Sequence, residues 1–173
     1  MNVVSTKTNL RRLIGAAAIA AMLLTNLPTR AAETSLPTAR DLAVEAQAAR
    51  QSGMPLIVLV SLAGCPHCEV VRRSHLLPLQ RDGSVTPKPV IRQVEINGRE
   101  PLGDFDGSQI SHAEFAQRYK VKLAPVVFFF DAKGKQLAAP LVGAMLPDFY
   151  GAYLDAALGE AKSTLRQNKV PGR

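Results

Sequence analysis

The two cysteines of this 173-residue chain, Cys65 and Cys68, are the feature that most restricts its fold and its chemistry. They follow an apolar run, Leu56–Val60, whose β-favouring residues predict a buried strand over 56–61. Pro66 stands where a first helical residue is expected, and apolar residues follow it at helical spacing. Cys65 should therefore lie at a strand-to-helix turn, where unpaired backbone N–H groups and the helix dipole stabilise a thiolate. Cys68 would lie one helical turn away, close enough to form a disulfide or to resolve a mixed one.

Residues 1–31 have the composition of a secretory signal peptide. A basic stretch precedes the apolar run 13–24, and the small residues Thr29 and Ala31 mark a cleavage site. The apolar run is shorter than the roughly 18–20 residues that span a bilayer, so we expect no stable membrane anchor. No cysteine follows this run directly, which argues against a lipid anchor. We therefore expect export to the periplasm, with a mature chain that begins at Ala32.

Much of the positive charge of the chain belongs to this leader. Residues 1–31 carry four Lys and Arg residues and no acid, so their removal lowers the formal net charge from +7 to +3. Aromatic residues make up 5% of the chain, and no run of Lys or Arg is interleaved with them, which argues against a nucleic-acid surface. An exported protein works where disulfides persist. With no other cysteine in the chain, the two cysteines either pair with each other or exchange with other proteins.

The remaining pattern predicts one α/β domain over residues 38–160. Thr38 is expected to cap a helix over 41–50, and Pro78 to end or kink the helix that opens at Cys65. A strand is expected at 90–96, a loop at 97–111 and a helix from 111 or 112 to 119. A strand at 126–130 should then form a hairpin with 135–142. The last expected elements are a helix at 147–158, with Phe149, Tyr153, Leu154 and Leu158 on its apolar face, and a flexible tail at 161–173. This order predicts a mixed sheet, parallel first and then antiparallel, with helices on both faces.

Three motifs, in this order, resemble the thioredoxin fold over roughly residues 40–160. They are Cys65-Pro66-His67-Cys68 after a strand, Ala124-Pro125 before the run 126–130, and Leu141-Val142-Gly143-Ala144 before the last helix. The resemblance implies a thioredoxin-like thiol:disulfide oxidoreductase in which Cys65 is the attacking thiol and Cys68 the resolving one. It also implies that Pro125 is a cis-proline facing the cysteines, that the main chain at Ala124 pairs with an extended substrate, and that Gly143 lets another backbone approach.

The dipeptide between the cysteines is similar to that of DsbA-type periplasmic oxidants. Its histidine would lower the pKa of the Cys65 thiol beyond the effect of the helix. Two positions depart from thioredoxins, because Leu59 replaces a buried acid and Gly64 replaces a common tryptophan. The chain also has no room between Cys65 and Pro125 for the helical domain inserted in DsbA-type oxidants. We therefore expect a compact thioredoxin-like module with a comparatively oxidising cysteine pair.

The expected partners are protein thiols and disulfides, together with a membrane protein that resets the cysteine pair. We expect a monomer with no metal and no cofactor beyond the redox-active Cys65–Cys68 disulfide, and we expect His75 and His112 at the surface or at helix caps.

Three alternatives stay open. The first is a periplasmic thioredoxin-like reductase that serves sulfur metabolism or cytochrome maturation. The second is a copper or zinc carrier that uses Cys65, Cys68 and a nearby histidine, because soft thiolates bind these metals. The third is a chaperone-like binding module whose cysteines form a static structural disulfide.

We predict that the protein recovered from a periplasmic extract begins at Ala32, because Thr29 and Ala31 place small residues where a signal peptidase requires them. N-terminal sequencing of the extracted protein checks this. A chain that still begins at Met1, or that stays with membranes after a salt wash, would contradict the prediction.

Overall fold

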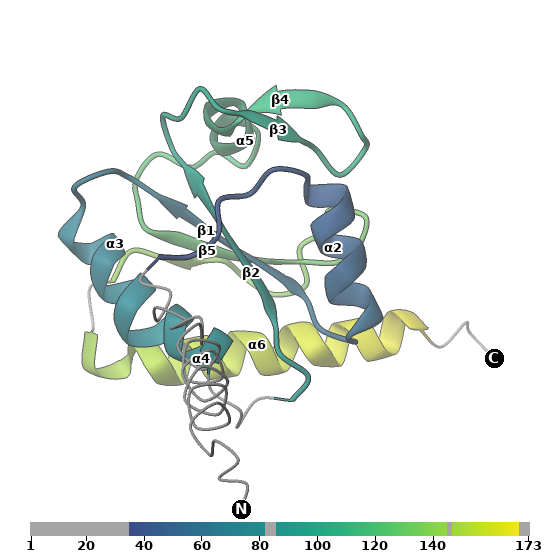
Figure 1. Cartoon of the computed structure of the whole chain (residues 1–173). Coiled ribbons are helices and arrows are strands. Elements are labelled where there is room, and N and C mark those ends of the chain that lie inside the picture. Colours follow the sequence, from purple (N-terminus) through teal and green to yellow (C-terminus); the bar gives the residue numbers. More distant parts are fainter. Residues whose placement is uncertain (1–34, 82–85, 145–146, 170–173) are drawn as a thin grey trace, which may run out of the picture. The chain divides into compact units, whose positions relative to one another are not determined.

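The computed structural model describes residues 35–81, 86–144 and 147–169, so the predicted signal peptide and its cleavage site lie outside the described residues. The described chain forms a four-stranded sheet in the order β2-β1-β5-β6 and a two-stranded sheet, β3-β4 (Figure 1). In the larger sheet, β1 (Leu56–Ser61) and β2 (Val90–Glu95) are parallel. β5 (Val126–Phe130) runs antiparallel to both β1 and β6 (Leu141–Val142). The mixed sheet predicted from the element order is confirmed.

The strand β1 is a central strand that is buried on both faces. All of its residues are buried, and their side chains alternate between two apolar clusters. Ile57 and Leu59 belong to one cluster, whereas Leu56, Val58 and Val60 belong to the other. A strand covered on both sides needs apolar residues at every position, which is why its sequence is a continuous apolar run.

One face of the sheet is covered by the helix that follows the cysteines and by the C-terminal helix α6 (Pro147–Lys169). The first helix consists of α3 (Pro66–Val70), the π-helical segment η1 (Val71–Leu76) and α4 (Leu77–Arg81) (Figure 1).

Pro78 does not end this helix, so that part of the prediction is wrong. The backbone N–H of Leu77 donates to the carbonyl of Arg72 in the wider π-helical turn. This turn immediately precedes Pro78, which has no N–H to donate, and the chain then continues as a helix to Arg81.

The opposite face is covered in part by α2 (Leu42–Gln51), which begins at a different cap from the one predicted. The carboxylate of Asp41 accepts the N–H of Val44 at 2.9 Å and is the N-cap. Thr38 instead forms an isolated parallel bridge with Gln93 of β2. Because Thr38 pairs with the edge strand β2, Asp41 and not Thr38 accepts the N–H group at the start of α2.

The second helix on this face, α5 (His112–Arg118), begins where the sequence predicts. Ser111 and Glu114 form a capping box, in which each side chain accepts the backbone N–H of the other residue. The helix contributes one ring, that of Phe115, to a group of aromatic rings whose centroids lie 4.7–6.1 Å apart. These rings belong to Phe115, Tyr119, Phe128 and Phe130.

Residues 97–111 are not the loop predicted from the sequence. β3 (Pro101–Gly103) and β4 (Gln109–Ser111) pair in an antiparallel hairpin, which lies next to α5 in Figure 1. Asp104, at the end of β3, is buried and forms an ion pair with Arg118. Strands of three residues are too short to show an alternating pattern, and this ion pair ties the hairpin to α5.

The helix α6 continues to Lys169, so the predicted helix end at 158 and the predicted flexible tail from 161 are wrong for residues 161–169. Phe149 and Tyr153, predicted on the apolar face, are 61% and 52% exposed. The buried stripe follows a spacing of three and four residues and extends past the predicted end. It consists of Tyr150, Leu154, Ala157, Leu158, Ala161 and Leu165.

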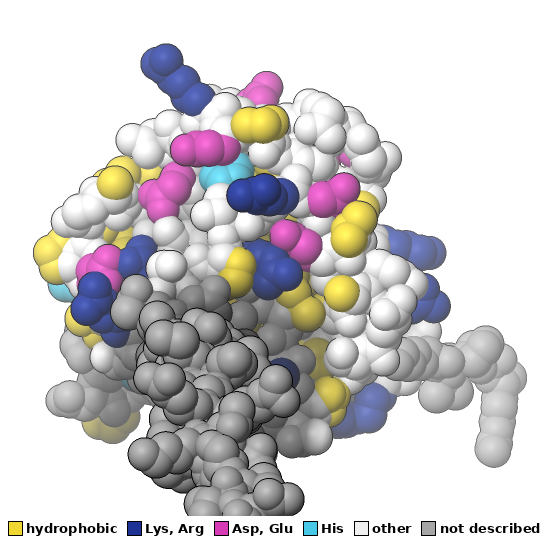
Figure 2. Space-filling view, viewed as in Figure 1, with side chains coloured by type: hydrophobic (Ala, Val, Ile, Leu, Met, Phe, Trp, Pro, Cys, Tyr) yellow, Lys and Arg dark blue, Asp and Glu magenta, His cyan; other side chains and the backbone are white. Residues whose placement is uncertain are grey.

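The surface of the described residues carries charges of both signs. Figure 2 shows Lys and Arg side chains interspersed with Asp and Glu side chains on the visible part of this surface. One of the pairs joins Arg92 of β2 to Glu45 of α2 at 2.9 Å. Among the described helices, none has both the length and the apolar character that crossing a bilayer requires.

Replacing Leu165 by alanine should destabilise the protein by about 2–5 kcal/mol, because this buried side chain is part of the apolar stripe of α6. Chemical denaturation of the L165A variant measures the loss. Arg166→Ala is the matched control, since Arg166 is exposed on the same helix and should change stability by less than about 0.5 kcal/mol. Equal stabilities of the two variants would show that this part of α6 does not pack on the core.

Candidate active site

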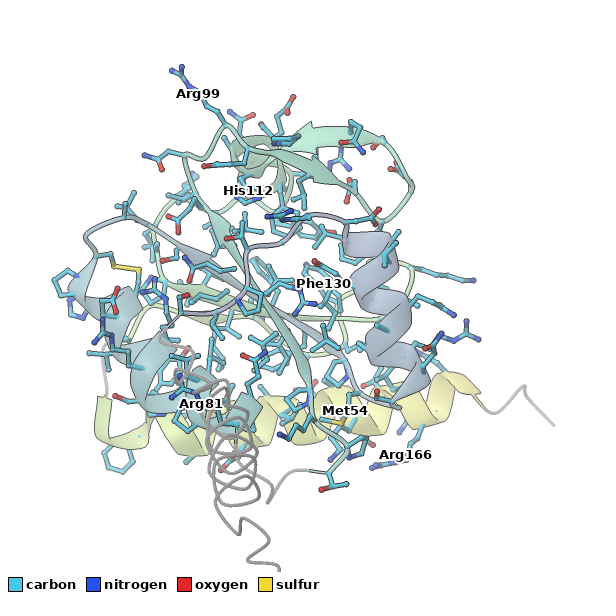
Figure 3. The ribbon with its side chains drawn as sticks, in the orientation of Figure 1. Met54, Arg81, Arg99, His112, Phe130 and Arg166 are labelled. Carbon is cyan, nitrogen blue, oxygen red and sulfur yellow. A yellow bond between two sulfur atoms is a disulfide. The ribbon has the colours of Figure 1, made fainter. Side chains whose placement is uncertain are left out.

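The two cysteines form a disulfide at the N-terminal end of α3, visible as the yellow bond in Figure 3. Cys65 is the N-cap of this helix, and its Sγ accepts the backbone N–H of Cys68 at 3.2 Å. The sulfur therefore occupies the place that a capping oxygen takes in other helices. Cys65 is partly exposed, whereas Cys68 is fully buried. An incoming sulfur can reach only Cys65 without a change in structure.

The turn between β1 and α3 explains why a glycine precedes the first cysteine. Gly64 has φ +73°, in the left-handed region, and the N–H of Cys65 donates to the carbonyl of Leu62 at 3.2 Å. A Cβ atom at position 64 would meet no atom within 4 Å. The backbone conformation, rather than a lack of space, therefore favours glycine here over a residue such as tryptophan.

The site residues predicted from the three motifs lie together. Cys65 Sγ is 4.0 Å from the carbonyl oxygen of Ala124, and the Ala124–Pro125 peptide bond is cis, as predicted. Gly143 has φ +74°, and its N–H donates to the carbonyl of Pro125 at 2.8 Å. Pro66 is the first residue of α3. The structure thus brings these segments to one place, and the roles of the individual residues in catalysis stay predictions.

A groove with a volume of about 330 Å³ lies beside the disulfide. Two exposed apolar side chains, Leu123 at 52% and Val142 at 60%, contribute to its walls. Val142 belongs to the third sequence motif, but neither side chain was predicted to line the site, because a single apolar residue in a loop or a short strand carries no sign of its exposure. The full lining consists of His67, Leu123, Ala124, Pro125, Val142, Gly143 and Ala144.

Leu59 is fully buried in the apolar cluster on the α3 face of the sheet. The strand β1 therefore presents a hydrocarbon side chain at position 59, where the sequence departs from the buried acid of the thioredoxins it resembles. No carboxylate of β1 can act on the cysteines, since every residue of this strand is apolar or serine.

A half-buried cation, Arg72, lies four residues beyond Cys68. Its guanidinium donates to Ser61 Oγ at 3.1 Å and to Gln93 Oε1 at 2.8 Å, and it forms an ion pair with Glu69. The hydrogen bond from Arg72 is the main reason that the pKa of Glu69 is lowered. Sequence reasoning missed this residue, although a cation one helical turn after a buried cysteine was a usable signal.

The other two histidines lie outside the groove. His75 is half-buried, 4.9 Å from the ring of Tyr150, and burial lowers the pKa of His75. His112, labelled in Figure 3, is fully buried and is the first residue of α5, whose cap is Ser111, so the predicted position at the surface or at a helix cap is wrong. Its Nδ1 accepts the N–H of Glu95 at 3.2 Å, and its Nε2 lies 3.1 Å from the carbonyl oxygen of Ala39. His112 thus joins three segments of the fold.

The cysteines have no metal-binding cluster around them in the described part of the chain. Within residues 35–81, 86–144 and 147–169, no three His, Cys, Asp or Glu side chains are grouped as they are around a metal ion. A copper or zinc carrier would therefore have no third protein ligand from these residues to add to the two cysteines.

The chain is similar to known proteins in both sequence and fold. The family model of the thioredoxin-like domain matches residues 42–158. Mitochondrial thioredoxin 3 from Saccharomyces cerevisiae, in its oxidized form, has a TM-score of 0.50 and 15% identity, and the match covers 75% of this chain and 99% of that protein. No curated protein matches the chain.

Two further structures show lower structural similarity. Thioredoxin O2 from Arabidopsis thaliana has a TM-score of 0.47 and 17% identity, with 72% of this chain and 96% of that one covered. A thioredoxin-fold protein from Helicobacter pylori has a TM-score of 0.41 and 19% identity, with 66% and 84% covered. Because the family model matches most of the described domain, and because Cys65 and Cys68 form a disulfide at the start of α3, this chain belongs to the thioredoxin-like family and is a thiol:disulfide oxidoreductase.

Proposed function

We propose that this oxidoreductase works in the periplasm as a comparatively oxidising partner of protein thiols. The observation that carries the proposal is the place of Cys65 Sγ, which caps the helix that follows it and accepts the N–H of Cys68. A thiolate formed at this sulfur on reduction would keep that donor and the positive end of the helix dipole. Both interactions favour the reduced protein, which makes the disulfide a stronger oxidant.

The exchange follows from the different exposure of the two sulfurs. A substrate thiolate attacks the partly exposed Cys65 Sγ, the Cys65–Cys68 bond breaks, and its electron pair leaves on Cys68 Sγ. A second substrate thiolate then attacks the substrate sulfur of this mixed disulfide and releases Cys65 as a thiolate. Two electrons pass from the substrate to the protein, and the two thiol protons of the substrate pass to solvent or to the new protein thiols.

The surroundings of the cysteines support an oxidising pair. Leu59 places no negative charge on the sheet beneath α3, so this position does not oppose a thiolate. His67 is exposed and lines the groove beside the disulfide, where its imidazole can contact a bound substrate. Reoxidation requires a separate acceptor, and we assign this role to a membrane protein of the periplasmic face.

The periplasmic location rests on residues 1–31, whose basic, apolar and small-residue segments are typical of a cleaved secretory signal. An oxidising pair also needs a compartment in which disulfides persist. The thioredoxin-like reductase is the competing function, because a strong membrane reductant would reverse the flow of electrons through the same two sulfurs.

In the reduced protein, iodoacetamide at about pH 6 should label Cys65 and spare Cys68, since a free thiol titrates at about 8.5 and reacts slowly there. Burial of Cys68 protects it from the reagent, and the N-terminus of α3 favours the thiolate of Cys65. Mass spectrometry of tryptic peptides identifies the labelled residue, and labelling in denaturant is the control for equal intrinsic reactivity. Equal labelling of both cysteines in the folded protein would contradict the assigned roles.

The redox potential tests the direction of electron flow. Lowering the pKa of the attacking thiol by one unit stabilises the reduced form by about 1.4 kcal/mol, or about 30 mV for this couple. Equilibration with glutathione should therefore give a potential well above the value of about −270 mV known for thioredoxin. The His67→Pro variant should be less oxidising than the wild type. A wild-type potential close to about −270 mV that His67→Pro leaves unchanged would favour the reductase.

A further inference from the structure

The groove beside the disulfide does not end at the cysteines. We call this groove the proximal groove. Its lining includes His67 of α3, Pro125 and Gly143. A second hollow of about 250 Å³, the distal groove, is lined in part by residues 119–123 and by Phe128. Leu123 and Val142 line both grooves. The two hollows are therefore adjacent, with Leu123 and Val142 contributing to both, and the distal groove is the one whose lining lies further from Cys65.

The two grooves follow the β5–β6 side of the sheet. Val126 and Val142 are register partners of the antiparallel pair, so their side chains lie on the same face. Phe128, two residues after Val126, lies on that face as well and also lines the distal groove. The strand β6 has a neighbour on only one side within the described sheet. An extended peptide can therefore lie along this edge with apolar side chains against Leu123 and Val142.

The distal groove differs from the proximal one in its charge. Lys120 and Lys122 contribute to its lining and are exposed, whereas no Asp or Glu does. Among the described residues, neither lysine takes part in an ion pair. The surface of the distal groove therefore has two positive charges that no described carboxylate neutralises.

The backbone that carries the lysines is held in place. The N–H of Lys120 donates to the carbonyl of Gln117 at 2.9 Å, and that of Val121 donates to the carbonyl of Ala116 at 2.8 Å, which closes the end of α5. Val121, which stands between the two lysines in the sequence, packs against the buried cluster that contains Phe128. The charges are thus anchored on a fixed part of the fold, on the approach to the disulfide.

We propose that the two grooves select protein substrates in which an apolar residue adjoins the reacting cysteine and acidic residues follow within a few positions along an extended segment. The apolar side chain contacts Leu123 and Val142, and the carboxylates lie near Lys120 and Lys122. This inference rests on the proposed exchange of disulfides with protein thiols, and it names the class of peptide that the site prefers.

The test uses single-cysteine peptides of equal length with leucine beside the cysteine and either three glutamates or three glutamines in the following positions. Stopped-flow measurement of mixed-disulfide formation with the oxidised protein gives a second-order rate constant for each peptide. The Lys120→Gln/Lys122→Gln variant should slow the acidic peptide roughly threefold to tenfold and leave the neutral peptide within about twofold. Comparing one peptide on two proteins cancels any difference in thiol pKa between the peptides.

The matched control is Lys162→Gln/Arg166→Gln, which removes the same charge from α6, away from both grooves. It should leave the rate constants of both peptides within about twofold of the wild type. A second measurement needs no variant, because 0.5 M salt, at which the screening length is about 4 Å, should remove most of the advantage of the acidic peptide in the wild-type protein. An equal loss in the two double variants, or a salt-independent rate, would overturn the proposal.

Reaction with dithiothreitol, a neutral dithiol, distinguishes a failure of the proposed exchange function from a failure of the substrate preference alone. If the wild-type disulfide reacts with neither dithiothreitol nor any peptide, the proposed exchange function fails and the substrate preference fails with it. If dithiothreitol and the neutral peptide react normally, but the lysine substitutions leave the acidic peptide unaffected, only the substrate preference is overturned. Equal dithiothreitol rates in the variants and the wild type also show that the substitutions preserve the fold of the site.

Discussion

The central strand β1 can be buried only if helices cover both faces of the sheet, and the position of the active site depends on that requirement. The helix that begins at Pro66 supplies part of one cover, so the chain must turn from the end of β1 directly onto that face. This turn places Cys65 just beyond the C-terminal end of β1, with its sulfur on the helix N-terminus. Packing of the core therefore determines which backbone groups surround the reactive sulfur.

Antiparallel pairing completes the site. Val60 at the end of β1 lies opposite Val126 at the start of β5, so the Ala124–Pro125 bond reaches the edge where Cys65 lies. β6 pairs with β5 and ends beside the same edge at Gly143. Three segments that are distant in sequence meet at the disulfide because the register of the sheet aligns their ends.

The two sulfurs have different surroundings, and this difference gives the exchange its order. Cys65 has a backbone donor and access to solvent, whereas Cys68 is enclosed by the core. Leu59 places no charge on β1 beneath them, and Arg72, the cation four residues beyond Cys68, is held by Ser61, Gln93 and Glu69. Further along the surface, Lys120 and Lys122 add charge where a bound peptide would extend. The oxidising character and the substrate preference that we propose therefore depend on separate parts of the molecule.

Elements with strong local signals could be predicted from the sequence alone. The strands at 56–61 and 126–130, the helix start at Pro66 and the cap at Ser111 follow from apolar runs and capping chemistry, and the motif residues of the site lie together as the resemblance implies. Three-dimensional packing, which no local pattern encodes, set the short β3–β4 hairpin, the cap at Asp41 and the extension of α6 to Lys169. It also decided that Leu123 and Val142 are exposed and that Lys120 and Lys122 share a groove with them. These features depend on which distant residues lie alongside, and a local pattern contains no record of its neighbours in space.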